Sequence, residues 1–512
     1  MALLGSLIKS AYSIWNRPVE FKHKNVAIEK AQERQLARLI RKAKNTAFGE
    51  TYNFSSILKS DNIVQAFRES VPVHNYSSMY KNWWYRALNG EAYVAWPGKV
   101  KYFALSSGTS EASSKYIPVT EAMLRSIKRA SIRQIVSMVQ YDFPLDFYEK
   151  GMLMIGGSTH LQYNGTYYEG DLSGITAAGI PFWFQHFYKP GKKISRTTDW
   201  NTKLEEIIQK APEWDIGVIV GVPAWVQILL EKIIERYQLK TIHDIWPNLG
   251  VYAHSGVAIQ PYLKGFEKFF GKKMIFNESY LASEGFVAIQ SRENAGGMDM
   301  LVDNGIFFEF VPFNEANFDE EGDLRKNPQT FTLSEAEENV EYALLMTTNA
   351  GSWRYLIGDT VKILNKKHAE IQITGRTKHF LSICGEHLSQ ENMNRAIELL
   401  QNDLGIEINE FTVYAFAHKG RFAHQWYIGT EDQLDPKEAA KILDEHLKNL
   451  NDDYRVERLE AVTEVLVKVV SPKTFLHYME LKGKVGSANK FPRVLKNGRI
   501  TEWEDFLKNQ NA

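Results

Sequence analysis

Cysteine is almost absent from this sequence, since Cys384 is the only one among 512 residues. A single cysteine cannot form an internal disulfide, so nothing indicates folding in an oxidising compartment. A lone cysteine is more often a small buried side chain than a nucleophile, so we do not expect Cys384 to be catalytic. The chain also lacks a cysteine pair for structural zinc and a histidine pair with zinc-protease spacing.

An excess of either charge is missing as well. Lys and Arg together number 61, Asp and Glu together number 61, and the formal net charge is zero. A balanced chain offers no overall electrostatic attraction to a phosphate backbone, although this does not exclude local basic clefts. We therefore expect no nucleic-acid partner.

Long apolar runs are absent too. No segment approaches the roughly 20 consecutive apolar residues that span a bilayer, so we expect no membrane span. The first 18 residues, MALLGSLIKSAYSIWNRP, lack the basic start and the small-residue cleavage site of a secretory signal. We interpret them as a packed amphipathic helix, with weak membrane contact through Trp15 as the alternative. The default expectation is a cytoplasmic protein.

What the sequence does contain is an alternation of strand and helix signals. Val100–Leu105 is typical of a strand, and Ile216–Val220 is a continuous apolar run of the kind found in buried parallel strands. The second run ends at a glycine and a proline, and a helical apolar pattern follows. This strand, tight turn and helix predict an α/β core. We also expect a capping box at Thr202 and Glu205, and a strand over Leu301–Phe310.

The C-terminal part has a different pattern of predicted strands and helices. Residues 411–430 predict a hairpin with a polar turn at Lys419 and Gly420, and Asp435 followed by Pro436 predicts a capped helix. A strand-like segment comes next, which makes a compact α+β pattern. We therefore predict a large α/β N-terminal domain over residues 1–365 and a smaller α+β domain over residues 366–512.

One serine-rich stretch raises a chemical question. The segment FALSSGTSEASSKYIPVT runs from Phe103 to Thr120 and is not a Walker-type loop, because no second glycine is followed by lysine. Hydroxyl groups, a glycine that allows close backbone approach and a lysine could together hold phosphate. The residues with these properties are Ser106, Ser107, Gly108, Thr109, Ser110 and Lys115. Composition alone leaves a plain Ser/Thr turn open as the alternative.

Distant segments change this choice when they are considered together. In chain order they are SSGTSEASSK (106–115), YLASEG (280–285), YLIGD (355–359), TGRTKHFLSICGEHLS (374–389) and NKFPR (489–493). This set resembles the adenylate-forming superfamily, and within it the Gretchen Hagen family of auxin-responsive acyl-acid amido synthetases and their bacterial relatives. NTAFGETYNF (45–54) and GVPAWVQILL (221–230) add to the resemblance, which covers nearly the whole chain. Departures are Glu111 and Ala112, where a glycine is expected, and Leu356, where an arginine is common.

The resemblance implies a luciferase-like N-terminal domain of mixed β-sheets and helices, with a small mobile C-terminal domain. It also implies an ATP- and Mg²⁺-dependent ligase. A carboxylic acid would attack the α-phosphate of ATP and release pyrophosphate, and an amino acid amine would then displace AMP. The residues implied to bind ATP are Ser106, Ser107, Gly108, Thr109, Ser110 and Lys115 at the phosphates, Ser255, Gly256, Val257 and Tyr280 at adenine, and Asp359 and Arg376 at ribose.

Further roles follow from the same resemblance. Glu284, with Ser283 in the same motif, would act in catalysis as the Mg²⁺ ligand. Lys490 would bridge the attacking carboxylate and the α-phosphate, and Lys378 would be the hinge of a domain rotation. Two other functions stay open: an acyl-CoA ligase that shares the adenylation step, and a non-catalytic nucleotide-binding protein. The sequence identifies neither the acid, the acceptor nor the oligomeric state.

Overall fold

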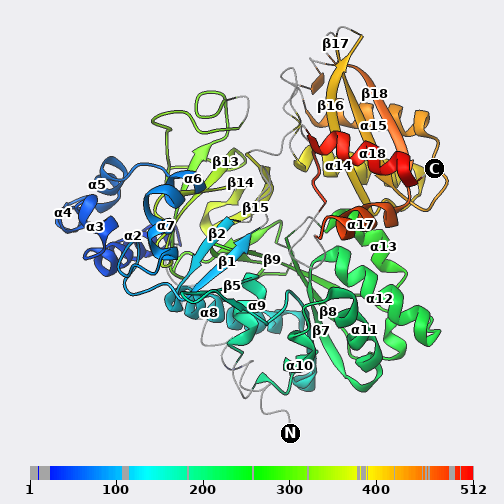
Figure 1. The fold of residues 1–512 in the computed structure, drawn as a ribbon, viewed down its shortest axis with the longest axis horizontal. Coiled ribbons are helices and arrows are strands. Elements are labelled where there is room, and N and C mark those ends of the chain that lie inside the picture. Colours follow the sequence, from blue (N-terminus) through cyan, green and yellow to red (C-terminus); the bar gives the residue numbers. More distant parts are fainter. Residues whose placement is uncertain are drawn as a thin grey trace.

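The computed structural model describes Ser10 and residues 24–106, 115–180, 184–256, 259–293, 295–319, 322–377, 381, 388, 390–419, 421–451, 454–455, 458, 462–483, 491–495 and 498–510. Within these residues the strands form an 11-stranded, a four-stranded and a three-stranded sheet. Helices surround the sheets (Figure 1). The α/β fold class with mixed sheets is confirmed.

The large sheet has an antiparallel part and a smaller parallel part. Its spatial order is β12 (Ile306–Pro312), β13 (Glu341–Thr348), β14 (Tyr355–Asn365), β15 (Glu370–Arg376), β11 (Met298–Met300), β10 (Gly285–Ile289), β9 (Ile275–Ala282), β8 (Val251–Ser255), β7 (Ile216–Gly221), β3 (Gly151–Ile155) and β6 (Tyr188–Lys189). Strands from β12 to β9 pair antiparallel, and those from β9 to β6 pair parallel. Strand β9 is therefore the junction at which the strand direction changes.

The predicted strand–turn–helix unit is confirmed. Strand β7 lies between parallel neighbours and is followed by α12, which begins at Pro223, where a missing N–H costs nothing.

Two local expectations were wrong. Helix α11 begins at Trp200, because Asp199 caps it by accepting the Thr202 N–H at 2.8 Å. The strand expected from Leu301 begins at Ile306, since the preceding residues turn through Gly305 at φ +92°.

The N-terminal and middle parts contain most of the described α-helices. They are α2 (Lys24–Ala43), α3 (Ala47–Thr51), α4 (Phe54–Ile57), α5 (Ile63–Ser70), α6 (Tyr76–Met79), α7 (Tyr85–Leu88), α8 (Glu121–Ser137), α9 (Leu172–Ala178), α10 (Lys192–Ser195), α11 (Trp200–Lys210), α12 (Pro223–Tyr237) and α13 (Gln260–Glu267). The four-stranded sheet has the order β2 (Lys115–Val119), β1 (Tyr102–Ser106), β5 (Tyr168–Gly170) and β4 (Gln162–Tyr163). Strands β1 and β2 are antiparallel, and the expected phosphate loop joins them.

The C-terminal part has its own sheet and its own apolar clusters. Strands β16 (Glu410–His418), β17 (Arg421–Gly429) and β18 (Val462–Val470) form it, and the helices are α14 (Gln390–Leu404), α15 (Pro436–Leu450), α17 (Pro472–Leu481) and α18 (Gly498–Gln510). The predicted hairpin is confirmed, with Lys419 at φ +49° in its turn. The division at residue 366 stays a prediction. Because β15 pairs within the large sheet, we propose that the boundary falls after Arg376.

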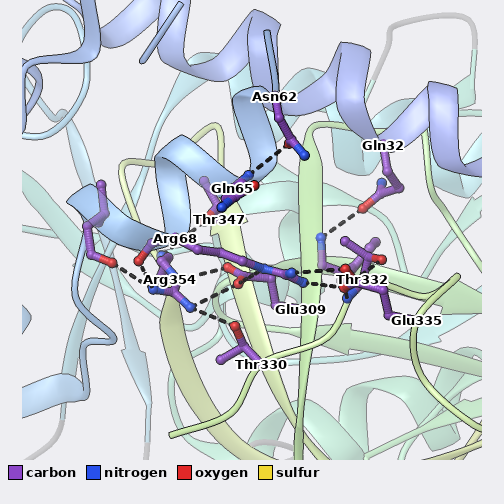
Figure 2. Close-up of polar contacts among 12 residues, drawn as sticks. Gln32, Asn62, Gln65, Arg68, Glu309, Thr330, Thr332, Glu335, Thr347 and Arg354 are labelled. Carbon is purple, nitrogen blue, oxygen red and sulfur yellow. Dashed lines mark hydrogen bonds and ion pairs between the residues drawn. The ribbon is translucent and has the colours of Figure 1, made fainter. Parts of the chain in front are cut away.

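A buried ion-pair network ties the N-terminal helices to the antiparallel half of the sheet (Figure 2). Glu309 on β12 accepts from Arg354 Nε and Nη2, each at 3.0 Å, and from Arg68 Nε of α5 at 3.3 Å. Arg354 also donates to the backbone carbonyls of Arg68 and Val71. Arg354 directly precedes β14, so this network anchors the start of a strand that carries a candidate site residue.

Candidate functional site

A cleft with a cavity volume of about 1750 Å³ lies along the carboxyl ends of the parallel strands. Its walls include Gly156 after β3, Ser255 at the end of β8 and Tyr280 on β9, and the C-terminal part contributes Arg493. Ligands of open α/β sheets bind at such strand ends, near the point where the connections diverge. The cleft therefore has the expected position of a binding site.

Three side chains from three strands meet on one wall of this cleft. The Tyr280 hydroxyl donates to Asp359 Oδ2, and Arg376 Nε forms an ion pair with Asp359 Oδ1 at 2.8 Å. Asp359 and Arg376 are direct cross-strand partners on β14 and β15. Gly358 adopts φ +89°, a conformation that favours glycine, and its carbonyl accepts the Thr377 N–H at 2.8 Å. The backbone at this glycine thus sets the position of the Asp359 carboxylate.

Glu284 lies in the turn between β9 and β10, close to these three residues. Its side chain is buried, and the cleft reaches it. Burial raises the pKa of this carboxyl to about 7, the negative charge of Asp359 adds to the shift, and Arg376 and Lys115 oppose it. Among the described residues no lysine or arginine lies within ion-pair distance of Glu284. The site therefore holds a buried carboxyl group without a cationic partner.

The other predicted nucleotide-binding residues fall into two groups. Lys115 at the start of β2, Ser255, Gly256 and Ser283 line the same cleft. Ser106 ends β1 and pairs with Lys115 through the backbone. The remaining predicted residues lie outside the described part of the chain: Ser107, Gly108, Thr109, Ser110, Val257, Lys378 and Lys490, together with the two departures Glu111 and Ala112.

The cleft also contains polar groups that were not predicted from the sequence. Burial raises the pKa of Glu278 on β9 to about 6. Tyr355 is buried beside Glu284, and burial raises the pKa of its hydroxyl well above the usual value. Lys203 on α11 and Asp171 before α9 line the far part of the cleft. Lys203 could have been found from the sequence, because it interrupts the apolar stripe that Trp200, Leu204 and Ile207 form on the helix.

Two features are absent from the part of the chain that the structure describes. No helix there is both long and apolar enough to cross a bilayer. No group of three or more His, Cys, Asp or Glu side chains is arranged there to hold a metal ion.

The fold is shared with an acyl acid amido synthetase and an acyl-CoA ligase of known structure. A GH3.15 acyl acid amido synthetase structure matches with a TM-score of 0.77 and 15% identity, covering 98% of this chain and 96% of that one. A 2-hydroxyisobutyryl-CoA ligase in complex with an acyl-adenylate matches with a TM-score of 0.60 and 14% identity, covering 94% and 92%.

The particular family follows from three domain models that together span most of the chain. They are the GH3 family N-terminal domain over residues 19–205, the central domain over 299–376 and the C-terminal domain over 391–499. The chain belongs to the GH3 family, which confirms the expected Gretchen Hagen membership.

Individual relatives are distant. A probable indole-3-acetic acid-amido synthetase GH3.9 of Oryza sativa subsp. japonica is 24% identical over 269 residues, 48% of this chain and 59% of the relative. The indole-3-acetic acid-amido synthetase GH3.3 of Arabidopsis thaliana is 25% identical over 285 residues, 52% and 46%. A jasmonoyl–L-amino acid synthetase JAR4 of Nicotiana attenuata is 27% identical over 203 residues, 37% and 34%. The chain thus spans about half the length of the indole-3-acetic acid-amido synthetases it matches.

Proposed function

We propose that this protein is an ATP-dependent acyl-acid amido synthetase. A carboxylate oxygen attacks the α-phosphorus of ATP, the bond to the β-phosphate oxygen breaks, and pyrophosphate leaves. An amino acid amine then attacks the acyl carbon, the acyl–phosphate bond breaks, and AMP and a proton are released. The observation that carries the proposal is the convergence of Tyr280, Glu284, Asp359 and Arg376 in one cleft at the strand junction.

Asp359 is suited to hold the ribose. A carboxylate offers about four lone-pair sites, and Tyr280 and Arg376 each occupy one, on different oxygens. The remaining two sites can accept the two ribose hydroxyls. The tyrosine and arginine fix the carboxylate before ATP arrives, so little ordering is needed on binding. Tyr280, Ser255, Gly256 and Val257 would then border adenine.

Glu284 is suited to Mg²⁺. A magnesium ion binds few protein carboxylates and completes its shell with phosphate oxygens and water, so a three-residue cluster is not needed. Burial and the charge of Asp359 raise the pKa of Glu284 more than Arg376 and Lys115 lower it, and a bound divalent ion would favour the charged carboxylate. Bound Mg²⁺ would neutralise charge on the phosphates as pyrophosphate leaves. Lys115 lines the same cleft and would contribute a second positive charge.

The predicted serine-rich loop, Lys490 and Lys378 keep their proposed roles. Ser106, Ser107, Gly108, Thr109 and Ser110 would bind the β- and γ-phosphates. Lys490 would bridge the acid and the α-phosphate, and Lys378 would be the hinge of a domain rotation. Lys490→Ala should abolish pyrophosphate exchange while ATP binding, measured by calorimetry, persists. Normal exchange in this variant would remove Lys490 from the mechanism. The cytoplasmic location also stays a prediction.

The acceptor is proposed to be an amino acid, in keeping with the amido synthetases among the relatives. Coenzyme A is the second candidate, because the fold is shared with an acyl-CoA ligase. Purified protein incubated with a panel of acids, ATP, Mg²⁺ and either amino acids or CoA, followed by mass spectrometry, separates the two. Acyl-amides support the proposal, and acyl-CoA without acyl-amide overturns the choice of acceptor. ATP binding without any product would support the non-catalytic alternative.

A further inference from the structure

Lys203 is a lysine at a core position of helix α11. The residue is 4% exposed and lies among Trp200, Leu204 and Ile207 on the buried face of the helix. Burying an ammonium group is costly unless other groups satisfy its donors. Within the described residues its only hydrogen bond is to the Gly156 carbonyl, at 3.2 Å, and no carboxylate lies within ion-pair distance. Two of its three N–H donors therefore have no hydrogen-bond acceptor there, and its Nζ also lies 5.9 Å from the centroid of the Trp200 ring.

Asp171 is the carboxylate that faces the same part of the cleft. It lies half-buried against Gly157, where an added Cβ would come within 2.1 Å of its Oδ2 atom. It caps no N–H of α9, and no hydrogen bond or ion pair to its carboxylate is formed by the described residues. Burial raises the pKa of Asp171 and lowers the pKa of Lys203, while the attraction between the two charges opposes both shifts. The Lys203 ammonium at Gly156 and the Asp171 carboxylate at Gly157 thus both have fewer hydrogen bonds from the described residues than they can form.

This pair of charges lies away from the nucleotide-binding wall. Gly156 follows β3, which is separated from β9 by β7 and β8 in the sheet order. Neighbouring strands are about 4.8 Å apart, so the pair lies roughly 15 Å along the sheet from β9. Trp225, Ile207 and Val222 line the cleft around it and provide apolar walls. An acid whose carboxylate reaches the α-phosphate could therefore extend its other end to Lys203 and Asp171.

We propose that Lys203 and Asp171 form a polar subsite that selects acids carrying a hydroxyl group at the end remote from the carboxylate. This inference rests on the proposed acid-activating function and specifies its substrate class. A hydroxyl oxygen accepts a hydrogen bond from the Lys203 ammonium, and the hydroxyl proton is donated to the Asp171 carboxylate. One neutral group satisfies both charges, and no proton transfer is required.

The same geometry disfavours the other acid classes. A hydrocarbon end would leave the ammonium and the carboxylate unpaired in a partly apolar chamber. A second carboxylate on the acid would be attracted to Lys203 and repelled by Asp171. A protonated amine would be attracted to Asp171 and repelled by Lys203. Sites built to bond a substrate hydroxyl discriminate strongly against analogues that lack it, because their buried polar groups are then left without partners.

The test compares matched acids in two assays that need no amine. The pairs are 12-hydroxydodecanoate against dodecanoate and 10-hydroxydecanoate against decanoate, with dodecanedioate as a further probe, because the subsite lies roughly 15 Å along the sheet and needs long acids. ATP–pyrophosphate exchange measures activation, and calorimetry without ATP measures binding of the acid alone. The wild type should favour the hydroxylated member of a pair by roughly tenfold or more. Lys203→Met should bring that ratio close to one, Asp171→Asn should reduce it, and Lys210→Met, an exposed lysine of the same helix, should leave it unchanged.

The results separate the inference from the proposed function. Exchange with plain and hydroxylated acids at equal efficiency would uphold the function and overturn the inference. Absence of exchange with every acid would count against the function. In that case calorimetry still decides. The inference is supported if the wild type binds the hydroxylated acid of each pair more tightly and Lys203→Met does not. It is overturned if both proteins bind the two acids of each pair equally well. A Lys203→Met effect confined to the KM of the amino acid in amide formation would also overturn it.

Discussion

Two buried glutamates of the large sheet have opposite surroundings. The Glu309 side chain is 1% exposed and is held by two arginines, with a bidentate pair to Arg354 (Figure 2). Glu284 is also buried, yet no described lysine or arginine pairs with it, and its pKa rises to about 7. Pairing makes a buried charge part of the framework, whereas an unpaired carboxyl at a cleft remains available to bind a cation. We therefore assign a structural role to Glu309 and a functional role to Glu284.

The largest expected effect is on the stability of the framework. Glu309→Gln leaves the guanidinium of Arg354, whose side chain is 7% exposed, without its counter-charge. We expect a loss of about 3–5 kcal/mol in the free energy of unfolding, measured by urea denaturation. Glu335→Gln is the matched control, because this partner of Arg68 is 47% exposed and should cost less than about 1 kcal/mol. Equal losses in the two variants would contradict the framework role of Glu309.

A smaller effect of opposite sign is expected at Glu284. Its pKa is raised from 4.5 to about 7, so the folded chain holds a proton between these values that the unfolded chain releases. The contribution of this group to stability is therefore present below about pH 4.5 and is lost as the pH rises through about 7. Above that window Glu284→Gln should be more stable than the wild type by on the order of 3 kcal/mol. Unfolding curves of both proteins across the window test this, and parallel pH profiles would contradict it.

The smallest expected effect concerns the residue that orients Asp359. Tyr280→Phe keeps the ring and removes the hydroxyl that donates to the Asp359 carboxylate. A hydrogen bond to a charged group contributes about 1.5 kcal/mol, so ATP binding measured by calorimetry should weaken roughly tenfold. Tyr342→Phe is a matched control, since its hydroxyl accepts the Glu337 N–H outside the cleft. Unchanged ATP affinity in Tyr280→Phe would leave this hydroxyl without a role in the site.

The sequence predicted those features that depend on neighbouring residues. The buried strand at Ile216, the hairpin turn at Lys419 and the Asp435 helix cap were all found because the responsible residues are adjacent in the chain. The start of α11 was misplaced, since Asp199 and Thr202 are both good caps and only the hydrogen bond decides between them.

The sequence was less informative about long-range pairing. The site motifs were recognisable through family resemblance, but the bond between Tyr280 and Asp359 depends on strand order and could not be derived from spacing. The contacts of Arg354 with Glu309 and Arg68 join segments 45 and 286 residues apart. Nothing local marks them, because each of these charged residues is equally consistent with an exposed position.

The most direct test is ATP–pyrophosphate exchange by Glu284→Gln, with an acid that the wild type activates and with unfolding measured on the same sample. We predict at least a hundredfold lower exchange, in the range found when one group that stabilises transition-state charge is removed. The free energy of unfolding should not fall, because no buried ion pair is broken. Exchange at the wild-type rate, or a loss of activity that follows a loss of stability, would contradict the assignment of this unpaired carboxyl to catalysis.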